Sequence, residues 1–160
     1  MNDRPAPIKN IFYRDGRPTR LGRVVNGFMA WYSGLGLPPR FQSALEVLRR
    51  TSGRVQTVPV VIATVDGDRY LVSMLGRGSE WVKNVEASGG EAVLRHGGRE
   101  PVRLVPVDDT AQRAPVLKEY CRIAPGGRRH FPIEKDAPLS EYEAIAERYP
   151  VFRIGRALPL

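Results

Sequence analysis

Residues 45–84 read LEVLRRTSGRVQTVPVVIATVDGDRYLVSMLGRGSEWVKN, and this stretch decides the fold. The nearly continuous β-branched and apolar run at 55–65 predicts a strand that is buried on both faces. Asp66-Gly67 is a strong signal for a two-residue hairpin turn, and 69–75 returns as the partner strand. Pro59 lacks a backbone donor, which predicts an edge, a bulge or a strand start at that point. The stretch therefore predicts an antiparallel hairpin.

Further short strands flank this hairpin. Residues 92–96 and 99–107, separated by Gly97-Gly98, predict a second hairpin, and 151–154 predicts a closing strand. Residues 41–50 fit a helix or a strand, because periodicity cannot decide over so short a run. Helices are expected at 19–34, 80–88, 109–122 and 140–148.

Capping residues set the expected helix starts. Ser79 is the candidate N-cap of the helix at 80–88, and Asp108-Asp109 can cap the next helix. Ser140 and Glu143 fit a capping box for the last helix. Pro115 lies inside its helix, so it should kink that helix or mark its true start.

The order of elements predicts an α+β fold with a largely antiparallel sheet. Most strands come as hairpins, and strand–helix–strand alternation is too sparse for a doubly wound sheet. A small closed or split β-barrel would satisfy the sheet edges. We expect one domain at 19–160 after an N-terminal arm at 1–18.

Composition limits the partners. The 160 residues carry a net charge of +8, from 25 basic and 17 acidic residues. Phosphorylated small molecules, nucleic acids and anionic membranes all suit such a charge. The charge is spread along the chain and no basic recognition helix is evident, which argues against nucleic acid. The helix at 19–34, flanked by Arg20 and Arg23, either packs on the core or contacts a membrane surface.

The rare residue types indicate a cytoplasmic protein without a metal site. Cys121 is the single cysteine, so it cannot form an intramolecular disulfide, and we expect it to be buried. His96 and His130 are flanked by arginine and lack metal-ligand spacing. Residues 1–9 lack the apolar core of a signal peptide.

Two loops carry the candidate chemistry. The first gathers arginines, hydroxyls and a glycine, which either form an anion-binding concavity or a solvated hairpin tip. Its residues are Arg49, Arg50, Thr51, Ser52, Gly53 and Arg54. The second loop, at 76–84, offers backbone N–H groups at a helix start. There Trp81 and Asn84 share one helix face, although a tryptophan taken alone is more often part of the core.

No nucleophile is evident, since Ser73 and Ser79 lack a nearby histidine. We therefore expect the reactive chemistry of an enzyme to belong to a bound cofactor.

The ordered motifs at 38–107 resemble the deazaflavin-dependent nitroreductase family, small proteins that use coenzyme F-420. The matching residues are Ser52, Gly53, Pro59, Asp66-Gly67, Gly76, Gly78, Trp81 and Asn84. A weaker match is the terminal segment at 149–154. The resemblance implies a split β-barrel, a strand at 41–50, and hydride transfer from the reduced coenzyme to a quinone, nitroaromatic or other conjugated acceptor.

The resemblance also implies a binding site. The two loops would hold the phosphate and acidic tail of the cofactor, and the strand at 58–61 would lie against the deazaflavin ring. The implied residues are Arg49, Arg50, Thr51, Ser52, Gly53, Arg54, Gln56, Val58, Pro59, Val60, Val61, Met74, Leu75, Gly76, Trp81 and Asn84. Tyr120, His130 and Phe131 are the candidates for the acceptor pocket, and Tyr120, Ser73 or water for the proton donor.

Three positions depart from the family pattern. Arg49 replaces a glycine, Thr51 a basic residue, and Gln56 an arginine. FMN is therefore the alternative cofactor. The alternative function is a non-catalytic protein of the same fold that sequesters a flavin, haem or lipid. A homodimer is a further expectation, because barrels with exposed apolar edges often associate.

Overall fold

The computed structural model describes residues 13–14, 17–18, 42–124 and 128–158. The predicted helix at 19–34 and most of the arm at 1–18 lie outside these residues. Within the arm, β1 (Tyr13–Arg14) and β2 (Arg17–Pro18) form a separate antiparallel pair.

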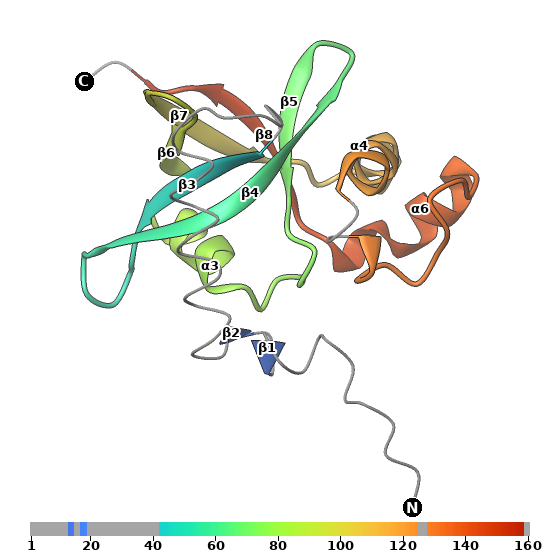
Figure 1. Ribbon diagram of the computed structural model, residues 1–160, viewed down its shortest axis with the longest axis horizontal. Helices are drawn as coiled ribbons and strands as arrows, with labels where there is room; N and C mark the ends of the chain where they lie inside the picture. The colour runs from blue at the N-terminus through green and yellow to red at the C-terminus, as the bar shows by residue number, and fades with distance from the viewer. Residues whose placement is uncertain (1–12, 15–16, 19–41, 125–127, 159–160) are drawn as a thin grey trace, which may run out of the picture.

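Six antiparallel strands close into a barrel, in the order β3-β4-β5-β8-β7-β6 (Figure 1). The strands are β3 (Gln42–Leu48), β4 (Val55–Val65), β5 (Asp68–Val72), β6 (Glu91–Arg95), β7 (Arg99–Pro106) and β8 (Val151–Arg156). The helices are α3 (Glu80–Ala87), α4 (Thr110–Ile123), α6 (Leu139–Ile145) and the 3₁₀ turn η1 (Ala146–Arg148). This architecture confirms the α+β barrel predicted from the sequence.

The β4–β5 hairpin forms as its sequence predicts. Asp66 and Gly67 have φ values of 51° and 84°. Positive φ at both central residues is the requirement of a type I′ turn, whose twist matches that of the flanking strands. Val65 then pairs with Asp68, and this register carries the ladder back to Ile62 and Leu71.

Strand β4 is less buried than the sequence predicts. We expected burial on both faces, yet Ala63 is the one fully buried residue of the strand. The reason is its pairing: residues 55–61 pair with β3, whereas only 62–65 pair with β5. The first half of β4 therefore has a ladder on one side among the described residues, which places Pro59 at an edge.

Two apolar clusters form the core. One fills the barrel with inward side chains such as Leu45, Leu71 and Leu104, and α3 adds Val82 and Val85. The other lies between the outer faces of β4 and β5 and the helices α4 and α6. Figure 1 shows these two helices together on one side of the barrel, with α3 apart from them.

One expected helix cap is wrong, and a second is right in position but lacks the side-chain bond. Pro138, and not Ser140, occupies the N-cap position of α6, so the predicted capping box does not form. Ser79 does precede α3, but its side chain makes no capping bond. Asp109 caps α4 as predicted, accepting a 2.9 Å hydrogen bond from the Ala111 backbone N–H. Pro115 neither starts nor interrupts α4, which is continuous from Thr110 to Ile123.

Candidate functional site

The first candidate loop is the tight turn between β3 and β4. Gly53 has a φ of 67° and donates a 2.8 Å backbone hydrogen bond to Arg49, which in turn donates one of 2.8 Å to Arg54. The side chains of Arg49 and Arg54 are exposed, and neither contacts a carboxylate among the described residues. Thr51 and Ser52 are also exposed. The turn therefore presents two uncommitted guanidinium groups to solvent.

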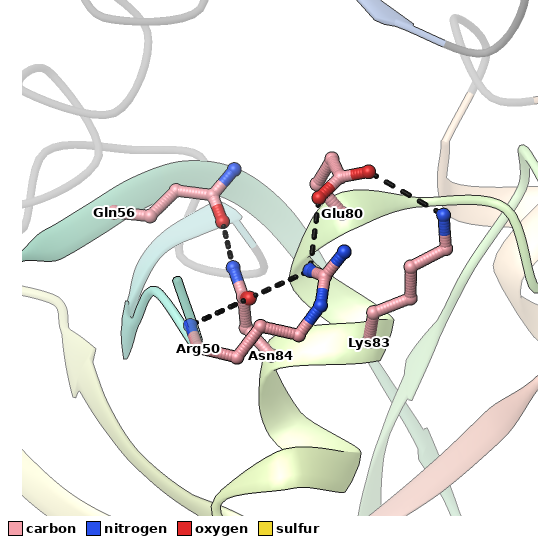
Figure 2. A network of polar contacts seen from close by, with 5 residues as sticks. All are labelled: Arg50, Gln56, Glu80, Lys83 and Asn84. Atoms are coloured by element: carbon pink, nitrogen blue, oxygen red, sulfur yellow. Dashed lines mark hydrogen bonds and ion pairs between the residues drawn. The ribbon is translucent and has the colours of Figure 1, made fainter. Parts of the chain in front are cut away.

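Asn84 joins this turn to helix α3 (Figure 2). Its side-chain Oδ1 accepts hydrogen bonds from the Arg50 backbone N–H at 3.1 Å and from Arg50 Nη1 at 3.0 Å. Its Nδ2 donates a 2.7 Å bond to Oε1 of Gln56 on β4. Asn84 is 3% exposed, so these bonds form away from water. The two candidate loops are thus held side by side by one buried amide.

The guanidinium of Arg50 already has a counter-ion. Its Nη1 lies 2.9 Å from Oε2 of Glu80, and Lys83 Nζ lies 3.4 Å from the other oxygen of the same carboxylate (Figure 2). The hydrogen bond from Arg50 lowers the pKa of the Glu80 carboxyl. Arg50 was predicted as a phosphate contact, but here its guanidinium is engaged by Glu80, a carboxylate that Lys83 shares, so the three side chains together keep a net positive charge.

The Glu80 carboxylate should stabilise the fold in a pH-dependent way. Because its pKa is lower in the folded state, its contribution is present above the unfolded pKa of about 4.3 and disappears as the pH falls through the folded value. We expect Glu80→Gln to cost about 0.2–1 kcal/mol at pH 7, as exposed ion pairs do. At an acidic pH that lies below the folded pKa as well, the difference should vanish. Urea unfolding of both proteins at the two pH values tests this, and a cost independent of pH would contradict it.

The second candidate loop, between β5 and α3, is closed by its own serines. Ser73 Oγ donates a 2.8 Å bond to the Gly76 carbonyl and lies 3.0 Å from Ser79 Oγ. This contact explains why the Ser79 hydroxyl makes no capping bond to the backbone of α3. Gly76 has a φ of 81°, and a Cβ there would lie 3.2 Å from the Arg148 carbonyl oxygen. Only glycine allows this close approach of the turn to η1.

Trp81 packs at the barrel rather than standing free. Its ring centroid lies 5.6 Å from that of Phe152, and it packs against the cluster inside the barrel. The structure thus favours the core interpretation of Trp81, which remains half-buried.

The four apolar β4 residues predicted to face a cofactor ring do not share a face. Val58 and Val60 pack against the cluster inside the barrel, whereas Val61 packs against the cluster under α4. Strand side chains alternate, so Pro59 points to the same side as Val61. Since the barrel interior is filled, only Pro59 and Val61 point to the outer side, where a ring would have to bind.

The remaining candidates lie toward α4. Met74 is half-buried and its sulfur accepts a hydrogen bond from Tyr120 Oη at 3.4 Å, while Leu75 is half-buried in the turn. Tyr120 and Phe131 are 4% and 7% exposed, with ring centroids 5.9 Å apart. His130, which precedes Phe131 in the sequence, is half-buried. Tyr120 and Phe131 are thus part of the core, and their assignment to an acceptor pocket stays a prediction.

Sequence reasoning missed Arg113. It is the one charged side chain among the described residues that is buried, with 4% exposure. Its Nε donates to the Val107 carbonyl and its Nη1 donates a 3.0 Å bond to the Ala146 carbonyl. The available signal in the sequence was the position of Arg113 in the helix at 110–123. It lies one turn after the Asp109 cap and on the same apolar face as Ala114 and Val116.

The described residues contain neither a metal-binding cluster nor a membrane-spanning helix. No group of three or more histidine, cysteine or acidic side chains comes together in a metal-binding arrangement there. Nor is any helix in these ranges both long enough and apolar enough to cross a bilayer. Cys121 is buried as expected, and burial raises its pKa.

Comparison with known proteins defines the fold. No family model and no curated protein matches the chain. Among solved structures, a domain-swapped dimer has a TM-score of 0.52 and 16% identity, over 84% of this chain and 93% of that one. A conserved hypothetical protein from Mycobacterium tuberculosis has a TM-score of 0.52 and 12% identity, over 91% and 85% of the two chains.

An F420-H2 dependent reductase is a further structural neighbour. Its TM-score is 0.49 at 19% identity, over 72% of this chain and 94% of that one. At identities of 12–16%, the likeness to the two structures with a TM-score of 0.52 concerns the fold alone, and it agrees with the barrel that the sequence predicted.

Proposed function

We propose that this protein is an oxidoreductase that takes hydride from reduced coenzyme F-420 and passes it to a quinone, nitroaromatic or other conjugated acceptor. The observation that carries the proposal is the junction at Asn84. Through it the arginine-rich turn meets the middle of α3, next to the partly exposed strand β4. This is the arrangement that the ordered motifs of the family resemblance call for.

The side chains present suit an anionic, phosphorylated cofactor. Arg49, Arg54 and Arg77 are exposed and have no carboxylate partner among the described residues. Gly53 has no Cβ, and the space where one would lie is open, so a ligand can approach the main chain of this turn closely. Charge-assisted bonds from guanidinium groups to phosphate are strong and geometrically specific. Arg50 contributes less than the resemblance implies, because Glu80 holds it.

When bound, the cofactor would supply the hydride chemistry. The protein would then supply orientation and exclusion of water, which Pro59 and Val61 can provide on the outer side of β4. Ser73 and Tyr120, the predicted proton donors, donate instead to Gly76 O and Met74 Sδ. In this proposal the proton therefore comes from water.

A titration with oxidised F-420 and, in parallel, with FMN tests the cofactor. We expect F-420 fluorescence to change on binding, and the reduced coenzyme to be oxidised when menadione is added. Binding of FMN alone would replace the cofactor in the proposal. Absence of binding together with absence of F-420 oxidation would contradict the proposed function.

The second candidate is a binding protein of the same fold that sequesters a flavin, haem or lipid. The observation that favours it is the engagement of Ser73 and Tyr120 within the protein, which leaves no side chain assigned to proton transfer. Tight binding of F-420 or FMN without turnover of any acceptor would support this candidate over the first.

The association state and location belong to the same proposal. One structural neighbour is described as a domain-swapped dimer. We propose a homodimer for this chain as well, with a mass twice 17.9 kDa. A cytoplasmic location, with membrane contact through 19–34, stays a prediction, because those residues lie outside the described part of the chain.

A further inference from the structure

Arg113 is buried with its charge but without a counter-ion. Its two hydrogen bonds go to the backbone carbonyls of Val107 and Ala146, and its Nη2 makes no recorded bond within the described residues. No carboxylate lies within ion-pair distance of it in the described chain. A buried guanidinium without an ionic partner is costly, and burial accordingly lowers its pKa.

A second arginine, Arg77, acts on this guanidinium through its charge. The charge of Arg77 lowers the pKa of Arg113 further, whereas Asp108 and Glu147 act in the opposite direction from outside ion-pair distance. Arg77 is exposed, on the turn between Gly76 and Gly78. Like charges repel each other, so an anion that reached both guanidinium groups would offset the part of this repulsion that Asp108 and Glu147 leave.

Backbone contacts independently bring these two elements together at η1. Gly76 approaches the Arg148 carbonyl so closely that a Cβ would lie 3.2 Å from its oxygen. Arg113 Nη1 donates to the Ala146 carbonyl of the same 3₁₀ turn at 3.0 Å. The buried guanidinium of Arg113 and the backbone next to Arg77 therefore both adjoin η1.

We propose that Arg77 and Arg113 form an oxyanion subsite that takes a phosphate or diphosphate group of the ligand. The assignment of this subsite to a cofactor phosphate rests on the proposed function. The binding of free pyrophosphate at the subsite does not depend on that function. The subsite supplies the cationic contact that Arg50 gives up to Glu80. It places the anion at the second turn and α4, and not only at the turn between β3 and β4. Planar guanidinium groups suit such oxyanions because they bind them with paired N–H donors.

Pyrophosphate titration by calorimetry, at constant ionic strength, tests the subsite. The variants are Arg77→Gln, which removes an exposed charge, and Arg113→Lys, which keeps the charge but loses the planar fork. Arg156→Gln, at the exposed end of β8, is the control, because it changes the net charge as Arg77→Gln does. We expect Arg77→Gln and Arg113→Lys each to weaken binding about tenfold or more, and the control about twofold or less.

Three results would overturn the subsite. They are absence of pyrophosphate binding by the wild-type protein, wild-type affinity in Arg77→Gln, and equal weakening in Arg77→Gln and the control. If Arg113→Lys does not fold by circular dichroism, Arg77→Gln decides alone, since its side chain is exposed.

Repeating the titration with F-420 and FMN separates this subsite from the proposed function. If F-420 binds the wild-type protein and both variants equally, the subsite is wrong and the function stands. If pyrophosphate binding depends on Arg77 and Arg113 while neither cofactor binds, the function is wrong and the subsite stands.

Discussion

Gly90→Ala should lower the free energy of unfolding by about 2–5 kcal/mol. Gly90 follows α3 with a φ of 93°, and a Cβ there would lie 2.4 Å from the Leu104 carbonyl oxygen. The backbone has no room to move apart, because Leu104 N donates a 2.8 Å bond to the Gly90 carbonyl and Gly90 N donates one of 2.9 Å to Val85. Urea unfolding followed by far-ultraviolet circular dichroism measures the loss.

The preceding glycine is a matched control. Gly89 also has a positive φ, of 68°, but a Cβ there would meet nothing within 4 Å. Gly89→Ala should therefore cost only the backbone conformational term of about 1–2 kcal/mol. Equal losses in the two variants would show that the contact with Leu104 gives way easily. The comparison matters for the site, because Gly90 joins the end of α3 to β7 and so helps to fix Asn84.

The β4–β5 hairpin shows what local sequence can predict. Strand β4 has the bounds that its β-branched run indicated, and the turn conformation follows from the φ preference of Asp66-Gly67. The ambiguous run at 41–50 required more than periodicity. It becomes strand β3 because it pairs with β4, the next strand of the chain, on one side and with the distant β6 on the other, where Leu45 pairs with Leu94.

The side-chain contacts of the site lay beyond such reasoning. The sequence pattern shows an arginine-rich turn, but it does not show which arginine forms an ion pair with a carboxylate. Arg50 finds Glu80 and Asn84 at separations of 30 and 34 residues. Ser79 is a favourable N-cap by type, yet its hydroxyl pairs with Ser73, a residue six positions earlier. Contacts formed by the tertiary fold thus override the local preferences of these side chains.

The same explanation applies to Arg113. Its burial depends on two carbonyl groups, those of Val107 and Ala146, that only the tertiary fold brings to it. Likewise the strand at 58–61 was predicted to present one face to a ligand. The alternation of a strand divides it into inward and outward residues, and the closure of the barrel decides which pair points outward.

Asn84→Ala should be the most damaging change at the candidate site, with a loss of about 2–4 kcal/mol in the free energy of unfolding. It removes the acceptor of the Arg50 backbone N–H and of Arg50 Nη1, and the donor to Gln56. The N–H groups of Arg50 and the amide oxygen of Gln56 would then lack partners at a buried position that water does not reach. Lys83→Ala is the control on the same helix, where an exposed ion pair is worth about 0.2–1 kcal/mol.

Further variants separate stability from the coupling of the two turns. Asn84→Asp can still accept from Arg50 but cannot donate to Gln56, so its loss should be smaller than that of Asn84→Ala. A double-mutant cycle of Asn84→Ala with Gln56→Ala should give a coupling energy of about 0.5–1.5 kcal/mol. If Asn84→Ala costs no more than Lys83→Ala, the buried amide does not hold the arginine-rich turn against α3. The site would then lose the contact that unites its two halves, because the other link, between Arg50 and Glu80, is an exposed ion pair too weak to fix the turn alone.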